Sequence, residues 1–319
     1  MKVLVTGVAG YIGSITADFL IKGGFDVVGI DNLSTGYINN INKDIEFIEI
    51  DMLKINSVLD KISDCEAVIH FAARSLVEES LRIPSFYYKN NVDGSSALLD
   101  VLKYTSIRKI IFSSSASVYG NPISSSINEF HQTIPLSTYG ETKLKTEIEI
   151  TQHCSNDDYG AVTLRYFNVS GAVLSGDVWL SEKHIPETHL IPNILNSNIL
   201  SPVKIFGSNW NTMDGSCIRD FVHVSDIAKA HIKALEIVSI GKNEIINLGS
   251  GSGYSVYDVI REAEIVTGKQ VFKDILERRA GDPAVLVADI SKAKQVLNWQ
   301  PSFSLKEIIR DSWMALDVK

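Results

Sequence analysis

Short apolar runs alternate with longer amphipathic stretches in the first half of the sequence, and this alternation narrows the choice of fold more than any other feature. Each longer stretch has helical periodicity, as in β-α-β units, whose buried parallel strands are continuous hydrophobic segments. The pattern therefore predicts an α/β fold with a doubly wound parallel sheet of the Rossmann type. The expected strands are 3–6, 26–31, 45–51, 67–71, 109–113 and 162–166.

The second half of the sequence is organised differently. Between about residues 171 and 215, prolines and scattered asparagines replace the long periodic stretches. The apolar run 244–248 is again strand-like, and we expect it to rejoin the main sheet. It ends in the glycine-rich run 249–253, which we interpret as a turn before a helix capped by Ser255 rather than as a second phosphate loop. We expect a nucleotide-binding domain of residues 1–170, completed by 217–255, and a smaller C-terminal substrate domain of residues 171–216 and 256–319.

Composition excludes several classes of protein. With 45% hydrophobic and 21% charged residues, the 319-residue chain has the composition of a globular protein. Its formal net charge of -8 argues against nucleic acid or an anionic membrane as a partner, and no apolar run approaches the roughly 20 residues of a membrane span. The cysteines are widely spaced and the histidines lack metal-ligand spacing, so we expect neither disulfides nor a bound metal. Together these features predict a cytoplasmic protein.

A glycine-rich segment follows the first predicted strand and opens the first predicted helix. Gly7, Gly10 and Gly13 form a G-x-x-G-x-x-G pattern. Glycines allow a tight turn in which backbone N–H groups and the positive end of the helix approach a pyrophosphate. Asp31, at the end of the second strand, has the spacing of an acid that accepts hydrogen bonds from an adenosine ribose. Because an acid there repels a 2′-phosphate, the pattern predicts NAD rather than NADP. The neighbouring Asn32 is either a further hydrogen-bonding group or a turn residue.

Tyr139 and Lys143 are four residues apart in a segment with helical character. We expect a capping box of Thr138 and Glu141 to begin the helix, so that Tyr139 and Lys143 share one face. An ammonium beside a phenol stabilises the phenolate, so the pKa of Tyr139 is expected to fall from about 10 toward neutrality, which makes the side chain a proton acceptor. Ser115 follows a predicted strand at the sheet edge where α/β folds bind ligands, and is expected to hold a substrate hydroxyl beside Tyr139. The alternative is an exposed Tyr-Lys pair on a helix.

In these motifs and in their order, the chain resembles the extended short-chain dehydrogenase/reductase family, and within it the UDP-glucose 4-epimerases. The resemblance implies interconversion of UDP-glucose and UDP-galactose by C4 epimerisation through a transient 4-keto sugar, with NAD as the cofactor. It also implies a homodimer. The matching segments are 7–13, 31–33, 70–73, 87–94, 112–120, 139–143, 165–168, 214–224 and 278–282.

The resemblance places residues in three groups. The catalytic positions fall on Ser115, Tyr139 and Lys143. Cofactor-contact positions, beside the three glycines, fall on Tyr11, Ile12, Asp31, Asn32, Asp51, Met52, Phe71, Ala72, Asn90, Lys143 and Phe167. Nucleotide-sugar positions fall on Ser115, Tyr139, Asn168, His189, Leu190, Lys204, Phe206, Arg219, Arg279, Asp282 and Leu286. Apart from the family, Arg219 and Arg279 are the bidentate donors that an acidic protein needs to hold a diphosphate.

Two positions depart from the family pattern. Arg74 and Ser75 follow the fourth predicted strand where many relatives have a cofactor-contacting lysine, so the cofactor is expected to be held less tightly. Leu286 stands where relatives restricted to non-acetylated sugars have a tyrosine. UDP-N-acetylglucosamine and UDP-glucuronate therefore remain alternative substrates.

Two further functions share the expected fold. Nucleotide-sugar 4,6-dehydratases carry Asp-Glu where this chain has Ser115 and Ala116, so we do not expect the groups needed to eliminate water. A dinucleotide-sensing protein without turnover is an alternative of another class, but it has no need of the Tyr139 and Lys143 pair.

Overall fold

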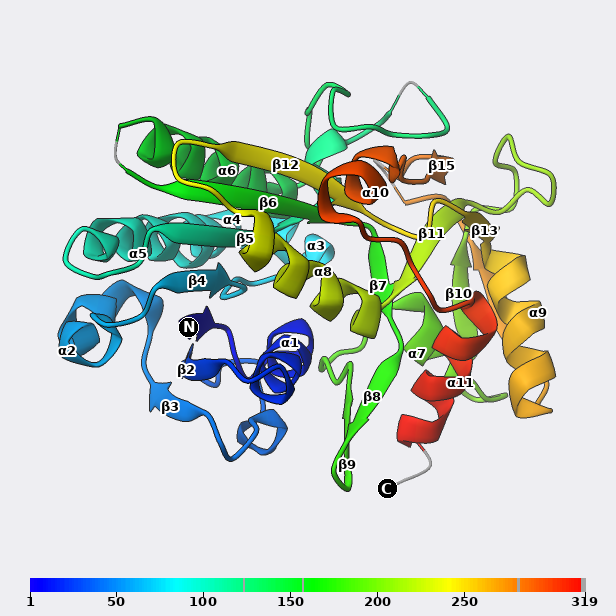
Figure 1. Cartoon of the computed structure of the whole chain (residues 1–319). Helices are drawn as coiled ribbons and strands as arrows, with labels where there is room; N and C mark the ends of the chain where they lie inside the picture. Colours follow the sequence, from blue (N-terminus) through cyan, green and yellow to red (C-terminus); the bar gives the residue numbers. More distant parts are fainter. Residues whose placement is uncertain (123, 157, 280–281, 317–319) are drawn as a thin grey trace.

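The structure, a computed structural model of the chain, describes residues 1–122, 124–156, 158–279 and 282–316. Within these residues seven parallel strands form a central sheet in the order β12-β6-β5-β4-β1-β2-β3 (Figure 1). The order reverses between β1 and β4, which is the switch point where doubly wound sheets bind ligands. The predicted fold class is confirmed, and 244–248 rejoins the sheet within β12. The strands are β1 (Lys2–Thr6), β2 (Asp26–Asp31), β3 (Glu46–Glu49), β4 (Ala67–His70), β5 (Lys109–Ser115), β6 (Gly160–Tyr166) and β12 (Asn243–Leu248).

Successive side chains of the central strands face opposite helical layers. In β1, Val3 and Val5 join the core beneath α1 (Tyr11–Lys22) and α8 (Val224–Ile237), whereas Leu4 joins the core on the other face. Because both faces are covered, the strands are apolar throughout rather than alternating. The second layer is built by η2 (Met52–Val58), α2 (Leu59–Ile62), α3 (Val77–Arg82), α4 (Pro84–Tyr87), η3 (Tyr88–Asp93), α5 (Gly94–Leu102) and α6 (Thr138–Asn156).

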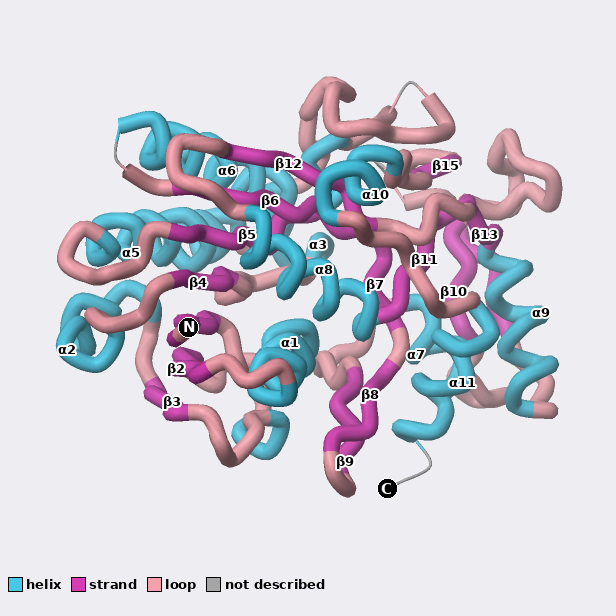
Figure 2. The backbone as a smooth tube through the Cα atoms, in the orientation of Figure 1, coloured by secondary structure: helices cyan, strands magenta, loops and turns pink. Residues whose placement is uncertain are grey.

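Smaller sheets follow the carboxyl end of the main sheet (Figure 2). Strands of these sheets share a separate core with helices of the second half of the chain. None of the helices in the described residues is long and apolar enough to cross a membrane. The strands are β7 (Asn168–Ser170), β11 (Ile218–His223), β13 (Gly253–Ser255) and β15 (Val285–Leu286) in one sheet, β10 (Val203–Phe206) paired with β14 (Lys273–Leu276), and the hairpin of β8 (Ala172–Ser175) and β9 (Val178–Ser181). The helices that contribute to this core are α7 (Leu190–Leu195), α9 (Val256–Thr267) and α11 (Leu305–Leu316), whereas α10 (Ser291–Leu297) packs against β12 of the main sheet and against α8.

The glycine-rich run 249–253 encloses a buried carboxylate. Asp220 accepts hydrogen bonds from the backbone N–H groups of Ser250 and Gly251, and a Cβ on Gly249 would lie 2.4 Å from its Oδ2 atom. These N–H groups are therefore already paired within the protein. The interpretation of the run as a turn rather than a phosphate loop is confirmed.

Two predicted helix caps have different outcomes. Ser255 caps α9 in a reciprocal capping box with Asp258, as predicted. The capping box of Thr138 and Glu141 is wrong, because Thr138 is already the first residue of α6 and Ser137 supplies the cap. The hydroxyl of Ser137 accepts a hydrogen bond from the backbone N–H of Gly140.

Candidate active site

The turn between β1 and α1 accepts only glycine at two of its three glycine positions. Gly7 has a φ of +73°, and a Cβ there would lie 2.7 Å from the backbone nitrogen of Ala72. A Cβ on Gly13 would lie 2.1 Å from the carbonyl oxygen of Gly7. Gly10 is the N-cap residue of α1, and no side chain caps the helix. The first turn of α1 therefore offers backbone N–H groups to an anionic ligand.

Acidic and amide side chains border this turn at the ends of β2 and β3. The Asp31 carboxylate accepts hydrogen bonds from the backbone N–H groups of Ala9, at 3.0 Å, and Leu33, at 2.8 Å. Asn32 donates to a carboxylate oxygen of Asp51 at 3.0 Å. Asp31, Asn32 and Asp51 thus lie together beside the glycine turn and form a cradle with it. Their contact with an adenosine ribose stays a prediction.

The remaining predicted cofactor positions lie on several other elements. Among them, the Tyr11 hydroxyl donates to the carbonyl of Gly171 at 2.6 Å and so ties α1 to the start of the β8–β9 hairpin. The Phe71 ring lies 4.7 Å from the His231 ring of α8. Ile12 lies in the first turn of α1, Met52 begins η2, Ala72 follows β4, Asn90 lies in η3, and Phe167 is buried between β6 and β7.

Arg74 does not replace the positive charge of the cofactor-contacting lysine that many relatives have after the fourth strand. Both carboxylate oxygens of Glu79 accept hydrogen bonds from Arg74, at 2.9 and 3.0 Å. The Arg74 guanidinium also lies 5.3 Å from the ring centroid of Phe86. Its charge is therefore satisfied on the α3 and α4 side, and Ser75 brings none.

Tyr139, Lys143 and Ser115 come together at the carboxyl end of β5. Tyr139 and Lys143 lie one turn apart on α6, and the Lys143 Nζ atom is 5.9 Å from the ring centroid of Tyr139. The same Nζ atom donates to the carbonyl of Ser113 at 2.8 Å. Ser115 hydrogen-bonds to Ser117 and is close enough to the Tyr139 hydroxyl to influence its pKa. The exposed Tyr-Lys pair considered from the sequence is therefore excluded, because Lys143 is buried.

The expected fall in the pKa of Tyr139 is not found in the protein alone. Burial raises the pKa of Tyr139 to about 12, although the hydrogen bond from Ser115 works in the opposite direction. Burial also lowers the pKa of Lys143 to about 7, against the attraction of Glu147. Both charged forms lose hydration, and this effect exceeds their mutual stabilisation. The phenolate therefore needs additional positive charge at the site.

A buried ion pair behind Lys143 was missed by the sequence analysis. Glu147 lies one turn beyond Lys143 on α6, and its carboxylate receives two hydrogen bonds from Arg165 of β6, at 3.0 and 2.6 Å. Both side chains are 4% exposed. Arg165 also donates to the Tyr119 hydroxyl at 2.9 Å, and Ser114 bonds to Glu147. The pair joins α6 to β5 and β6 directly behind the catalytic positions. The feature of the sequence that could have indicated this ion pair is an acidic residue, Glu147, four residues after Lys143.

One group of predicted nucleotide-sugar positions lies around β11 and β15. The Arg219 guanidinium is 3.6 Å from a carboxylate oxygen of Asp282. Leu286 is paired in register with Arg219. Asn168, in β7, pairs in register with Phe221 of β11. Residues 280 and 281, within the matching segment 278–282, lie outside the described residues.

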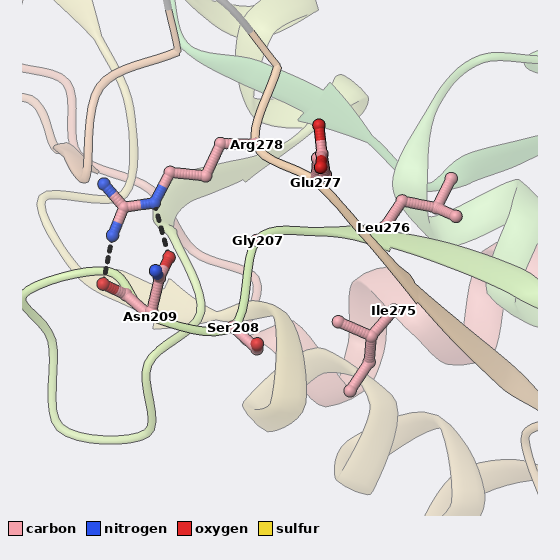
Figure 3. A pocket seen from close by; sticks show the side chains of 7 residues that line it. All are labelled: Gly207, Ser208, Asn209, Ile275, Leu276, Glu277 and Arg278. Carbon is pink, nitrogen blue, oxygen red and sulfur yellow. Dashed lines mark hydrogen bonds between the residues drawn. The ribbon is translucent and has the colours of Figure 1, made fainter.

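A second group lies near the ends of β10 and β14, beside an open hollow. The Arg279 guanidinium lies 3.7 Å from the ring centroid of Phe206. Next to it, Arg278 lies 4.1 Å from the Trp210 ring and donates to the Asn209 side chain at 2.7 Å (Figure 3). Lys204 lies in β10, whereas His189 and Leu190 lie at the start of α7. The hollow is lined by Gly207, Ser208, Asn209, Ile275, Leu276, Glu277 and Arg278.

The switch-point cradle and the Tyr139, Lys143 and Ser115 cluster define a short-chain dehydrogenase/reductase of the extended type. The chain belongs to the NAD dependent epimerase/dehydratase family, which matches residues 3–249.

Known proteins resemble the chain over nearly its whole length. It is 43% identical to a UDP-glucose 4-epimerase of Corynebacterium glutamicum, over 98% of this chain and 95% of that protein. A solved UDP-glucose 4-epimerase of Stenotrophomonas maltophila, with bound NAD and formylated UDP-arabinopyranose, superposes with a TM-score of 0.94 at 35% identity, covering 100% of this chain and 98% of the other. The UDP-glucose 4-epimerase of Brucella ovis in complex with NAD gives a TM-score of 0.92 at 39% identity, covering 98% and 97%.

Proposed function

We propose that the chain interconverts UDP-glucose and UDP-galactose by epimerisation at C4, with bound NAD. The observation that carries the proposal is the cluster of Tyr139, Lys143 and Ser115 at the same carboxyl edge of the parallel sheet as the glycine turn. Relatives of this identity and coverage are named for the same reaction, which supports the choice of substrate.

The residues of the cradle fit NAD. The glycine turn leaves space that a Cβ would fill, and the uncapped start of α1 suits a pyrophosphate. Asp31 keeps lone pairs for the adenosine ribose after its two backbone hydrogen bonds. Without a cation from Arg74 or Ser75, the cofactor is held less tightly than by relatives with a lysine. When bound, NAD would supply the redox chemistry and, in its oxidised form, a positive charge to the site.

The side chains of the cluster move and hold a proton. Tyr139 takes the proton of the sugar 4-hydroxyl as C4 is oxidised, and returns it when the 4-keto sugar has turned over and is reduced from its other face. Ser115 holds the reacting oxygen beside Tyr139, and the Lys143 ammonium stabilises the phenolate. The reaction is redox-neutral overall, because the substrate is oxidised and reduced once in each turnover.

The nucleotide part of the substrate is proposed to bind along the smaller sheets. Arg219 and Arg279 hold the diphosphate, with Asp282 orienting Arg219. The rest of the nucleotide sugar is surrounded by side chains from three elements. These are Phe206 and Lys204 of β10, Asn168 of β7, and His189 and Leu190 at the start of α7. Residues 171–216 and 256–319 would then form the substrate domain, with 217–255 completing the cofactor domain.

Two further properties belong to the proposal. The protein is cytoplasmic, and it is a homodimer formed through the apolar face of α3 and α4. Val77 and Leu81 of α3, Phe86 of α4 and Ile83 between the two helices are each more than two-fifths exposed. Such a face, beside α6, is the kind of surface that a second copy covers.

Because of Leu286, the N-acetylated UDP-hexoses are a second pair of candidate substrates. The side chain lies next to Arg219 in register, and it is smaller than the tyrosine that excludes an N-acetyl group in relatives. UDP-glucuronate is a further alternative substrate, because it differs from UDP-glucose only in carrying a carboxylate at C6.

The test is incubation of the NAD-loaded protein with UDP-galactose, UDP-N-acetylgalactosamine and dTDP-glucose in turn, with products identified by NMR. The expected result is an equilibrium mixture of UDP-glucose and UDP-galactose without accumulation of NADH. Stoichiometric NADH release would show a net dehydrogenase, and a 4-keto-6-deoxy product from dTDP-glucose would show a dehydratase. Bound NAD without any turnover would show a sensor.

A further inference from the structure

Two turns of the same construction follow each other between β9 and α7. In the first, a carboxylate oxygen of Glu182 accepts hydrogen bonds from the backbone N–H groups of Lys183 and His184, and bonds to the His184 ring. In the second, a carboxylate oxygen of Glu187 accepts hydrogen bonds from the backbone N–H groups of Thr188 and His189, both at 2.8 Å, and lies 2.7 Å from Nδ1 of His189. The sequence pattern is Glu-x-His, repeated after five residues.

The two turns bring imidazole and carboxylate groups together. Nδ1 of His189 lies 3.9 Å from a carboxylate oxygen of Glu182, and the rings of His184 and His189 are 5.5 Å apart. One ligand atom each of Glu182, His184 and His189 lies within 4.8 Å of the other two. The side chains are 13%, 21% and 40% exposed, so the cluster is shielded but open to solvent on the His189 side.

We propose that Glu182, His184 and His189 form a binding site for a divalent transition-metal ion of the zinc class. Two imidazoles and one carboxylate are a donor set that zinc favours, whereas calcium and magnesium favour oxygen donors. Ligand atoms about 2.0 to 2.1 Å from one zinc ion are roughly 3.4 Å apart, so side-chain movements of about 1 Å close the site. The ion replaces the hydrogen shared between His184 and Glu182.

The backbone of both turns is prepared for this role. The two N–H groups that bond to Glu182 fix its carboxylate, and those that bond to Glu187 place His189 at the start of α7. A ligating carboxylate held by hydrogen bonds is typical of metal sites, in which such bonds orient the ligand. The histidines lack the i, i+4 spacing of a helical site, which is why the sequence predicted no metal.

The cluster also borders a hollow next to the cofactor turn. Glu182 and His189 line this hollow together with Tyr11, whose hydroxyl bonds to the carbonyl of Gly171. His189 is a nucleotide-sugar position in the proposed function, so one consequence rests on that function. An ion that ligates His189 withdraws it from the substrate, and therefore weakens the binding of UDP-galactose.

Titration of the full-length, NAD-loaded and metal-depleted protein with cobalt(II) tests the site without turnover. One equivalent of cobalt is expected to give the visible absorption of a four-coordinate ion with nitrogen and oxygen ligands. His184→Gln and Glu182→Gln should each weaken binding by at least about 10- to 100-fold, the loss found even for groups that only support ligands. Gln at position 182 keeps a carbonyl oxygen for the two backbone N–H groups. His131→Gln, in a loop outside the cluster, is the matched control.

The proposal of a metal site would be contradicted if the wild type does not bind cobalt. It would also be contradicted if both substituted proteins bind cobalt as tightly as the wild type. Circular dichroism and NAD content confirm that each variant is folded. In kinetic assays zinc should raise the KM for UDP-galactose in the wild type and in His131→Gln but not in His184→Gln. An equal rise in all three would show that zinc acts elsewhere. Because the cobalt titration needs no substrate, loss of the proposed epimerase activity would not affect it, and failure of metal binding would leave that activity standing.

Discussion

At the scale of single residues, the proposed chemistry depends on one hydroxyl group. Tyr139→Phe removes that hydroxyl and keeps the buried ring, so α6 and the cofactor cradle should remain intact. We expect turnover of UDP-galactose to fall by roughly 10²- to 10⁴-fold, the usual contribution of a positioned acid or base. NAD content after purification, measured in parallel, should stay at the wild-type level. Near wild-type turnover in this variant would remove Tyr139 from the mechanism.

Leu286 allows a second residue-scale test, which concerns substrate size. The wild type should prefer UDP-glucose and UDP-galactose and act more weakly on the N-acetylated pair. Leu286→Tyr should suppress the acetylated activity selectively, by roughly 10- to 200-fold in kcat/KM, because fit in such a pocket is worth about 1 to 3 kcal/mol. Leu286→Ala, which enlarges the pocket, is the matched control and should shift the ratio the other way. Equal impairment of both substrate pairs by Leu286→Tyr would show that another residue sets the limit.

At the scale of elements, a buried histidine fastens α8 to the central sheet. Nε2 of His231 accepts a hydrogen bond from the Tyr166 hydroxyl of β6 at 2.5 Å, while Nδ1 donates to the carbonyl of Ile227 at 2.8 Å. Burial lowers the pKa of His231 to about 4 from an ordinary value near 6.5. Between these values the unfolded chain binds a proton that the folded chain does not bind, so the free energy of unfolding must fall as the pH falls from 6.5 to 4.

His231→Gln tests this coupling, because Gln can accept the Tyr166 hydrogen bond without titrating. Between pH 7 and pH 4 the wild type should lose about 3 kcal/mol more of its unfolding free energy than the variant, since one pKa unit corresponds to about 1.36 kcal/mol. Urea unfolding at a series of pH values measures both slopes. Parallel slopes would mean that His231 has the same pKa in the folded and in the unfolded protein.

Elements differ in how far the sequence predicts them. The strands of the main sheet were predictable because their apolar character is local and both of their faces are buried. The pairing of Glu147 with Arg165 was not predictable, because Arg165 lies 18 residues further on, in the strand β6 rather than in α6. The same holds for the cluster of Glu182 and His189, whose parts meet only after each turn has formed its own hydrogen bonds. The predicted pKa of Tyr139 failed for a further reason, because burial is a property of the assembled site.

At the scale of the whole molecule, the cofactor turn and the smaller sheets are directly connected. The Tyr11 hydroxyl of α1 bonds to Gly171, and Asp18 of the same helix accepts a hydrogen bond from Ser175 of β8 at 2.6 Å. The Asp220 carboxylate links β11 to the turn after β12 and to Ala288. The smaller sheets are therefore joined to the helix of the glycine turn by hydrogen bonds.

The apolar face of α3 and α4 leads to the last prediction, which concerns the assembly of two copies. Leu81 is 57% exposed and Phe86 is 44% exposed, and both helices pack beside α6, where Ile148 is 49% exposed. Burying one such side chain contributes about 1.5 to 3 kcal/mol, and in a two-fold interface each substitution counts twice. Leu81→Asp should therefore weaken a dimer by roughly 100-fold or more. Sedimentation velocity over a range of concentrations measures the change, with Leu200→Asp, at a side chain that is 92% exposed in a loop before β10, as the control. A wild type that stays monomeric at every concentration, or a dimer that Leu81→Asp leaves unchanged, would show that this face has another role.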